Sequence, residues 1–512
     1  MAALVARVVP DHTGRWTNAP KFLTGLALGA ALMAPLGALG ADLVQRAPER
    51  RINAFGTSNQ NFPAVAPAPD GGFVVAWDGR DPRYGVTRAI RTRRVTLNGL
   101  AIGEEFTLNQ IEKAPKDSVN SPTMAALGDS GFVVAWHGAY DQDGSYIGVF
   151  ARTLDSSGVP VSHDFQVNQS TFYDQASPRA ASIGDNGFVV AWNDYGYVLG
   201  PGKAVMVRTF DNTGKAASDE ILVSLDGRPR SIGVASLDES RLVVAWEQYV
   251  ENESEEIFAQ LHEFASGDST GRVSVNSYTT GPQLEPRVVA THDGGVLVSW
   301  SGNGNDGPGI YARFFDSTLA PIGPERRVQS VEAQPRLPHA VGALPDGSAV
   351  IAAGLDSSAE DAARDVSLVH FRASGVVNDF LVNSYTTGDQ GGSLGRDLAV
   401  ATQSDGGVLV VWRSEFQDES NGSIRGATFC LDPPLSASCG NATCVGDQSA
   451  ADPITAADAL ASLRSAIGIS ECDLCRCDVD SNGVVLASDA LRILGVAVAG
   501  NIQSLKCTAC AE

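Results

Sequence analysis

The first 429 residues of this 512-residue chain contain no cysteine, and basic residues are scarce throughout. There are 37 Lys and Arg against 59 Asp and Glu, which gives a formal net charge of −22. A chain of this charge repels phosphate backbones and anionic lipid, so we expect no nucleic-acid partner. An acidic chain is better suited to binding divalent cations. The hydrophobic fraction of 43% is ordinary for a globular protein and excludes a chain that is disordered throughout.

Signatures of common enzymes are also missing. The chain has no Gly-x-Ser-x-Gly nucleophile elbow, no His-Glu-x-x-His pair and no phosphate-binding loop. Its seven histidines are scattered, and none stands at a metal-ligand spacing. Carboxylates for glycoside cleavage could come from distant parts of the chain, so an enzyme is not excluded. The sequence nevertheless favours a protein without catalytic activity.

A long uncharged run lies near the N-terminus. Arg7, Arg15 and Lys21 precede residues 22–41, which are rich in Leu, Ala and Gly and end in small residues. This layout predicts a signal peptide over residues 1–41, and hence a secreted or cell-surface protein. The run is also long enough to span a bilayer, so an uncleaved membrane anchor stays open as an alternative.

One segment, Asp-Gly-Gly-Phe-Val-Val-Ala-Trp at 70–77, recurs six more times in degraded form, 53 to 59 residues apart. The closing residues of the copies are Trp77, Trp136, Trp192, Trp246, Trp300, Ala353 and Trp412. A period near 50 carried by short apolar runs is typical of a radial or stacked β array. Within each unit, four short runs separated by Gly, Asp and Asn turns match the four strands of one propeller blade. The tryptophans are interpreted as packing residues.

The two ends of the repeat region are incomplete in complementary ways. Ile52-Asn53 has the form of a fourth-strand ending but precedes any first strand, whereas the last unit, 397–430, stops after its third strand. Together the two fragments complete one blade, which removes exposed sheet edges. We therefore predict a mainly β fold, a seven-bladed β-propeller over residues 52–430, in preference to an open solenoid. Residues 42–51 are expected to be a linker.

Loops that leave a second strand and loops that enter a first strand should emerge on one face of the ring, where function would sit. Several loops that leave a second strand are rich in Asp, Asn and Gly. Tyr173, Tyr278 and Tyr385 recur at equivalent places and are assigned to the opposite face. There they could stack on a glycan ligand, or pack against the neighbouring blade.

The repeats resemble a family of secreted bacterial propeller-like proteins with tandem Asp-Gly-Gly-Phe-Val-Val-x-Trp, Ile-x-Ala-Arg-x-Phe-Asp and Phe-x-Val-Asn segments. Matching residues include Ile310-Tyr311-Ala312-Arg313 and Val275-Asn276. The resemblance runs from Ile52 to about Cys430. It implies an architecture and no particular activity, because these are residues that a blade needs for packing.

After Cys430 the composition changes, with a linker expected over 431–443 and a Cys-rich domain over 444–512. Residues 478–489 carry oxygen-bearing side chains at positions 1, 3, 5 and 12 of a twelve-residue loop, with Gly at position 6, which is the pattern of an EF-hand calcium loop. The predicted Ca²⁺ ligands are Asp478, Asp480, Asn482, the Val484 carbonyl and Asp489. A degraded upstream copy, expected to bind weakly or not at all, offers Asp447, Ser449, Thr455 and Asp458.

Two loop-helix repeats that close on Asp and continue into Ala-Leu resemble a dockerin, the calcium-folded module that docks secreted bacterial proteins onto cohesins. The resemblance implies a small α-helical domain after the propeller and a cohesin-like protein partner. In that family the residues just before the final Asp of each loop contact the partner. They map here to Ala456, Ala457, Ala487 and Ser488.

All eight cysteines lie at or beyond the end of the propeller, at Cys430, Cys439, Cys444, Cys472, Cys475, Cys477, Cys507 and Cys510. Two Cys-x-x-Cys pairs have the spacing of a zinc ribbon, but an exported protein favours disulfide bonds. The sequence does not determine their pairing.

Taken together, these features predict a monomeric, secreted or cell-surface binding protein with a propeller as recognition surface and a calcium-dependent tail for attachment. Two alternatives stay open. One is a polysaccharide-active enzyme, a glycoside hydrolase or lyase, that the tail delivers. The other is a structural surface protein with the tail as a stable cap.

Overall fold

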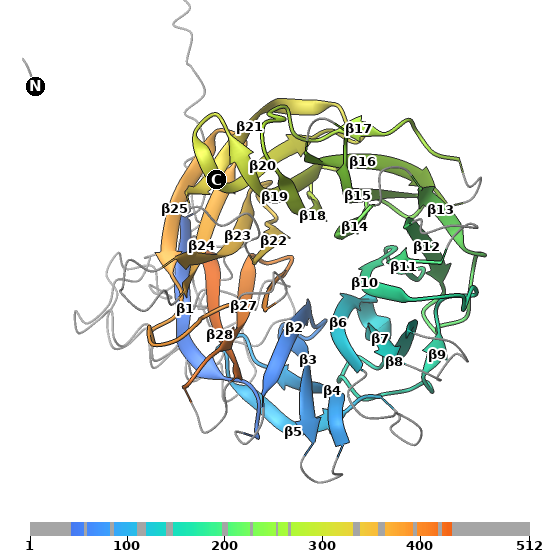
Figure 1. Ribbon diagram of the computed structural model, residues 1–512. Coiled ribbons are helices and arrows are strands. Elements are labelled where there is room, and N and C mark those ends of the chain that lie inside the picture. The colour runs from blue at the N-terminus through green and yellow to red at the C-terminus, as the bar shows by residue number, and fades with distance from the viewer. Residues whose placement is uncertain are drawn as a thin grey trace, which may run out of the picture. The chain divides into compact units, whose positions relative to one another are not determined.

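The structure, a computed structural model, describes most of the chain between residues 42 and 432 (Figure 1). The described residues are 42–55, 59–81, 86–109, 119–139, 147–196, 203–225, 229–251, 254–264, 268–330, 338–356, 364–392, 397–417 and 422–432. They form seven four-stranded antiparallel sheets around a common centre, which confirms the seven-bladed propeller (Figure 1).

The blades follow one another in chain order, and the first strand of each lies innermost. Blade 1 holds β2 (Gln60–Pro67), β3 (Phe73–Asp81), β4 (Val86–Val95) and β5 (Ala101–Thr107). Blade 2 holds β6 (Val119–Ala126), β7 (Phe132–Ala139), β8 (Ile147–Leu154) and β9 (Phe165–Gln166). Blade 3 holds β10 (Gln175–Ser182), β11 (Phe188–Asp194), β12 (Ala204–Phe210) and β13 (Ile221–Ser224). Blade 4 holds β14 (Ile232–Ser236), β15 (Arg241–Tyr249), β16 (Glu255–Glu263) and β17 (Val273–Ser274).

The remaining three blades have the same plan. Blade 5 holds β18 (Gln283–Ala290), β19 (Val296–Gly304), β20 (Gly307–Phe315) and β21 (Pro321–Ser330). Blade 6 holds β22 (His339–Ala343), β23 (Ala349–Asp356), β24 (Arg364–Arg372) and β25 (Gly375–Leu381). Blade 7 holds β26 (Leu398–Thr402), β27 (Gly407–Ser414), β28 (Ser423–Asp432) and, outermost, β1 (Asp42–Arg51).

The closing blade corrects one prediction and confirms another. Residues 42–51 are not a linker: they form β1, which pairs antiparallel with β28 from Asp42 opposite Asp432 to Arg51 opposite Arg425. The N-terminal fragment therefore completes the last unit, as the sequence indicated. The strand itself escaped prediction because an outermost strand buries few side chains, here Leu43 and Ala47, and so lacks an apolar run.

The six repeated tryptophans are fully or almost fully buried, which confirms their assignment to the core. A glutamine of the first strand satisfies the indole N–H in several blades. Trp77 Nε1 donates to Gln60 Oε1 at 2.7 Å, and Trp300 Nε1 donates to Gln283 Oε1 at 2.9 Å. A buried indole needs such an acceptor, because a donor left unpaired in the core costs free energy.

The repeated arginine of the third strand ties neighbouring blades together. Arg208 Nη1 donates to Val167 O of the preceding blade at 2.8 Å, and its Nε donates to Ser218 O at 3.0 Å within its own blade. Arg93 and Arg313 make the same two kinds of contact in their blades. The motif is therefore explained by blade packing.

The asparagine that follows the fourth strand extends the sheet with its side chain. Asn276 Oδ1 accepts a hydrogen bond from Ile257 N at 2.9 Å, while its Nδ2 donates to Tyr278 O at 3.1 Å. The same side-chain acceptor recurs at Asn53, Asn109, Asn168 and Asn383. These contacts fix where the chain turns from one blade into the next.

Candidate functional site

The propeller has two faces that differ in their connections. The loop face carries the loops from the second to the third strand and the loops from one blade to the next, and the turn face carries the remaining short turns. Tyr385 Oη donates to Phe416 O in the loop between β27 and β28, at 3.2 Å. The assignment of Tyr173, Tyr278 and Tyr385 to the opposite face is therefore wrong. Because antiparallel strands alternate in direction, a loop that enters a first strand must share a face with a loop that leaves a second strand.

Exposed aromatic side chains gather on the loop face. Phe172 (66% exposed), Tyr173, Tyr249 (54%) and Phe416 (57%) all belong to its loops or to the strand ends beside them. Phe172 and Tyr173 pack edge to face, with ring centroids 4.5 Å apart. Aromatic rings held at a polar rim in this way are suited to stacking on the apolar face of a sugar.

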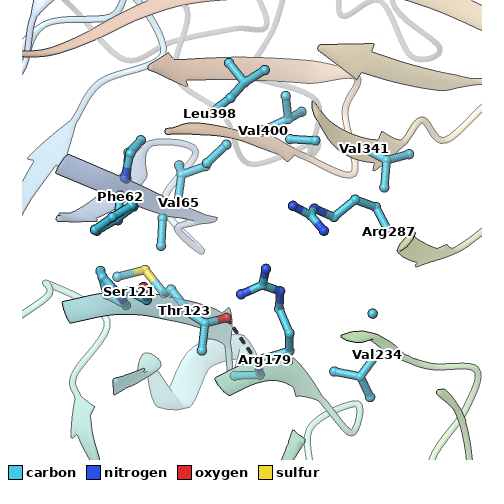
Figure 2. Close-up of a pocket in the computed structure, with 18 of the residues that line it drawn as sticks. Phe62, Val65, Ser121, Thr123, Arg179, Val234, Arg287, Val341, Leu398 and Val400 are labelled. Atoms are coloured by element: carbon cyan, nitrogen blue, oxygen red, sulfur yellow. Dashed lines mark hydrogen bonds between the residues drawn. The ribbon is translucent and has the colours of Figure 1, made fainter. Parts of the chain in front are cut away.

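A cavity of about 220 Å³ occupies the centre of the ring and is lined by the innermost strands of all seven blades. Its lining is mostly aliphatic and small. Arg179 of β10 and Arg287 of β18 are the charged side chains among the described residues that line it. Figure 2 shows both guanidinium groups directed into the cavity from nearby blades.

The strand register places the two arginines at one level of the channel. At this level, each first strand contributes one residue. Its partner on the second strand is the residue just before the repeated tryptophan, or just before Ala353 in blade 6. These residues are Ala64, Thr123, Arg179, Gly233, Arg287, Ala340 and Ala399. The next residue of each strand is apolar: Val65, Met124, Ala180, Val234, Val288, Val341 and Val400. The guanidinium groups therefore lie beside a low-dielectric ring, where their attraction for an anion is less screened than in water.

Backbone carbonyls hold the arginines in place. Arg287 Nε donates to His339 O of the next blade at 3.2 Å, and Arg287 Nη1 donates to Pro286 O at 3.1 Å. The Glu285 carboxylate lies 3.4 Å from the same Nη1. Arg179 Nη1 donates to Pro178 O at 3.1 Å. These contacts fix the direction in which each guanidinium points, which lowers the ordering cost of binding.

A β-bulge before a proline shapes four of the first strands. Phe62, Ser121, Ser177 and Glu285 each have a positive φ, between 51° and 61°, and each precedes a proline. The backbone amides of such residues are capped from the preceding blade: Glu285 N donates to Glu247 Oε2 at 3.3 Å and Phe62 N to Asp397 Oδ1 at 3.1 Å. Since a bulge re-aims the side chains that follow it, the bulges in β10 and β18 help to direct the two arginines inward.

Carboxyl groups with raised pKa values lie in blade 7. Burial raises the pKa of Asp397 above its usual range. Burial also raises the pKa of Asp389, and the nearby Glu415 charge raises it further. The Arg413 guanidinium pairs with Glu415 at 2.7 Å. A carboxyl group that keeps its proton at higher pH is a candidate general acid.

The predicted tail sites lie outside the described residues. They comprise the calcium ligands Asp447, Ser449, Thr455, Asp458, Asp478, Asp480, Asn482, Val484 and Asp489, the partner-binding residues Ala456, Ala457, Ala487 and Ser488, and every cysteine except Cys430. Cys430 is buried in β28. Within the part of the chain that the structure describes, no group of three or more His, Cys, Asp or Glu side chains could hold a metal ion. The same part contains no helix long and apolar enough to cross a membrane.

Little in the sequence marks the channel arginines as candidate site residues. Each stands in a Pro-Arg dipeptide, Pro178-Arg179 and Pro286-Arg287, and other repeats carry small residues at the same level. Only an alignment of the seven units by strand register would have set these two positions apart.

No protein-family model matches the chain, and no curated protein does. Solved structures with a similar arrangement of strands include a protein of unknown function from Dyadobacter fermentans, with a TM-score of 0.46 and 11% identity over 76% of this chain and 99% of that one. An α-L-arabinanase from Penicillium chrysogenum has a TM-score of 0.39 and 11% identity over 77% of this chain and 100% of its own. An α-L-arabinofuranosidase from Fusarium graminearum has a TM-score of 0.39 and 11% identity over 64% and 98%. The propeller assignment depends on the strand pairing of this chain. The sugars in the names of these enzymes describe the enzymes and carry no conclusion about this chain.

Proposed function

We propose that the protein is an exported recognition protein that binds, without chemical conversion, a glycan whose acidic group enters the central channel. The observation that carries this proposal is the pair Arg179 and Arg287, directed into an otherwise uncharged channel lining (Figure 2). Guanidinium groups pair with carboxylates through two parallel hydrogen bonds, which supports an acidic ligand. The exposed rings of Phe172, Tyr249 and Phe416 on the loop face support a sugar.

The rest of the proposal concerns export and attachment. Residues 1–41 direct the chain across a membrane, and the tail binds Ca²⁺ and docks onto a cohesin-like partner. Disulfide bonds stabilise that tail, and the chain acts as a monomer. The sequence patterns described above are the support for each of these points.

The channel is tested by measuring the affinity for D-galacturonate of the wild-type full chain and of its single variants Arg179→Gln and Arg287→Gln. Each loses a charged hydrogen-bond donor, so we expect the affinity to fall about tenfold or more. Isothermal titration calorimetry provides the measurement. Lys215→Gln on the turn face removes the same charge at an exposed site and should leave the affinity unchanged. Equal affinities for all four proteins, with the folds intact, would refute the channel as the binding site.

The calcium tail is tested by titrating the full chain with Ca²⁺ against a competing chelator. Asp480→Ala removes a side-chain ligand from the intact loop, and we expect it to weaken the tightest site at least tenfold. Asp447→Ala is the matched control, because its loop lacks the ligand at position 5 and the Gly at position 6. A chain that binds Ca²⁺ equally well with either substitution would contradict the assignment of the ligands.

A second candidate function is polysaccharide cleavage. The raised pKa values of Asp389 and Asp397 favour it, because each carboxyl group could hold a proton for a leaving group. Release of reducing ends from a panel of polysaccharides, lost in Asp397→Asn, would support this candidate in place of pure recognition. Asparagine can still accept the hydrogen bond from Phe62 N, so the substitution removes the proton without removing that contact.

A further inference from the structure

A second basic site lies away from the channel, where the closing blade meets blade 1 (Figure 1). A pocket of about 610 Å³ is lined there by Arg50 and Arg51 of β1, Arg425 of β28 and Arg93 of β4. Gly99 and Leu100 of the turn before β5 and Ala101, the first residue of β5, contribute to the lining. We call this pocket the arginine groove. Four cationic side chains in one groove are unexpected in a chain with a net charge of −22.

The repeat shows that three of these arginines are not needed to build a blade. Arg51 pairs across the sheet with Arg425. In four other blades, the cross-strand pair equivalent to Arg51 and Arg425 is, in that order, Thr107 and Arg91, Gln166 and Phe150, Ser274 and Phe258, or Leu381 and Ser367. Arg50 stands where those blades have Phe106, Phe165, Val273 and Phe380. Arg93, by contrast, is the repeated arginine that ties blades together.

The cross-strand pair of Arg51 and Arg425 has an energetic cost. Like charges directly opposite each other on neighbouring antiparallel strands destabilise the sheet. Other blades avoid the cost by placing at least one uncharged residue in the pair. An anion in the groove would offset the repulsion, because it lies close to both guanidinium groups at once.

The hydrogen bonding of the groove leaves two of its cations available. Among the described residues, the side chains of Arg50 and Arg51 have no hydrogen-bond or ion-pair partner, and both residues are exposed. Arg93 and Arg425 donate to backbone and hydroxyl oxygens. Glu49 also lines the groove, but its Oε2 accepts hydrogen bonds from Ser384 N and Ser384 Oγ, both at 2.8 Å.

We propose that the arginine groove binds a small ligand, or the end of a chain, that carries two or more oxyanion groups. Carboxylate, phosphate and sulfate share the planar or tetrahedral oxygen arrangement that guanidinium groups recognise. A long polyanion is disfavoured because the rest of the molecule is acidic, whereas a short one feels mainly the nearby arginines at physiological ionic strength. This site is separate from the channel, and the proposal does not depend on the function of the channel.

The test compares the full chain with the double variant Arg50→Gln/Arg51→Gln, using hexagalacturonate and inorganic pyrophosphate as probes. Calorimetry at about 0.15 M NaCl should show at least one probe binding to the wild-type chain about tenfold or more tightly than to the variant. Arg230→Gln replaces an exposed arginine of blade 4, is the control for loss of a positive charge elsewhere on the propeller, and should bind like the wild type. Because the carboxylates of hexagalacturonate also suit the channel, this probe is titrated in an Arg179→Gln/Arg287→Gln background, where Arg50→Gln/Arg51→Gln should still lower the affinity about tenfold.

Thermal unfolding without probe supplies a second readout. Because the double variant removes a like-charge repulsion, its melting temperature should equal or exceed that of the wild-type chain. Preference for hexagalacturonate would identify carboxylated sugars as the source of the oxyanion, and preference for pyrophosphate would identify phosphates. The proposal is overturned if neither probe binds the wild-type chain at millimolar concentration, if the double variant binds equally well, or if it melts at a clearly lower temperature.

Discussion

Removal of residues 1–51 should prevent the propeller from closing. This truncation deletes β1, which forms the outer edge of blade 7 and pairs with β28 along almost its whole length. It also removes Leu43, which is buried in the core shared with blade 6. The lost burial and sheet hydrogen bonds should lower the free energy of unfolding by at least about 5 kcal/mol, and the bare edge of β28 should promote aggregation.

Size-exclusion chromatography and thermal unfolding measure this effect. The matched control is the truncation of residues 1–41, which keeps β1 and should behave as a folded propeller with the full stability. A chain without residues 1–51 that stays monomeric and melts like this control would show that the ring does not depend on the N-terminal strand.

Replacement of Trp300 by alanine should destabilise the propeller by about 3–5 kcal/mol. Trp300 is almost fully buried, stacks on Tyr311 with ring centroids 6.1 Å apart, and donates its indole N–H to Gln283. The substitution leaves a cavity and a buried amide oxygen without its donor. Chemical denaturation, followed through the remaining tryptophans, gives the change in free energy.

Tyr249→Ala is the control for this substitution, because it removes an aromatic ring that is 54% exposed at the loop face. We expect it to change stability by about 0.5 kcal/mol or less. Similar losses from both substitutions would contradict the assignment of the repeated tryptophans to the blade cores. Blade 6 pairs Ala353 with the small Ser367 at this position, whereas blade 5 pairs Trp300 with Tyr311.

The propeller could be predicted because its signals repeat. The tryptophan, the third-strand arginine and the fourth-strand asparagine each do one packing or hydrogen-bonding task in several blades. Repetition makes such residues visible in a single sequence, and the complementary end fragments indicated how the ring closes. β1 itself was missed because its exposed face is polar and its pairing with β28 joins distant parts of the chain.

The candidate sites could not be predicted, because their residues do not recur from blade to blade. Arg179 and Arg287 depart from the small residues that most blades place at that level, so nothing in their immediate neighbourhood marks them. The arginine groove joins Arg51 to Arg425 only after the ring has closed. Both candidate sites therefore consist of departures from the repeat, which become visible only when strand register aligns the units.

The central claim, that the channel receives the acidic group of a ligand, is tested most directly by a crystal structure of the full chain with D-galacturonate bound. The account predicts the carboxylate within hydrogen-bond distance of both Arg179 and Arg287. A sugar bound at saturating concentration elsewhere on the molecule, with no carboxylate between these two side chains, would contradict it.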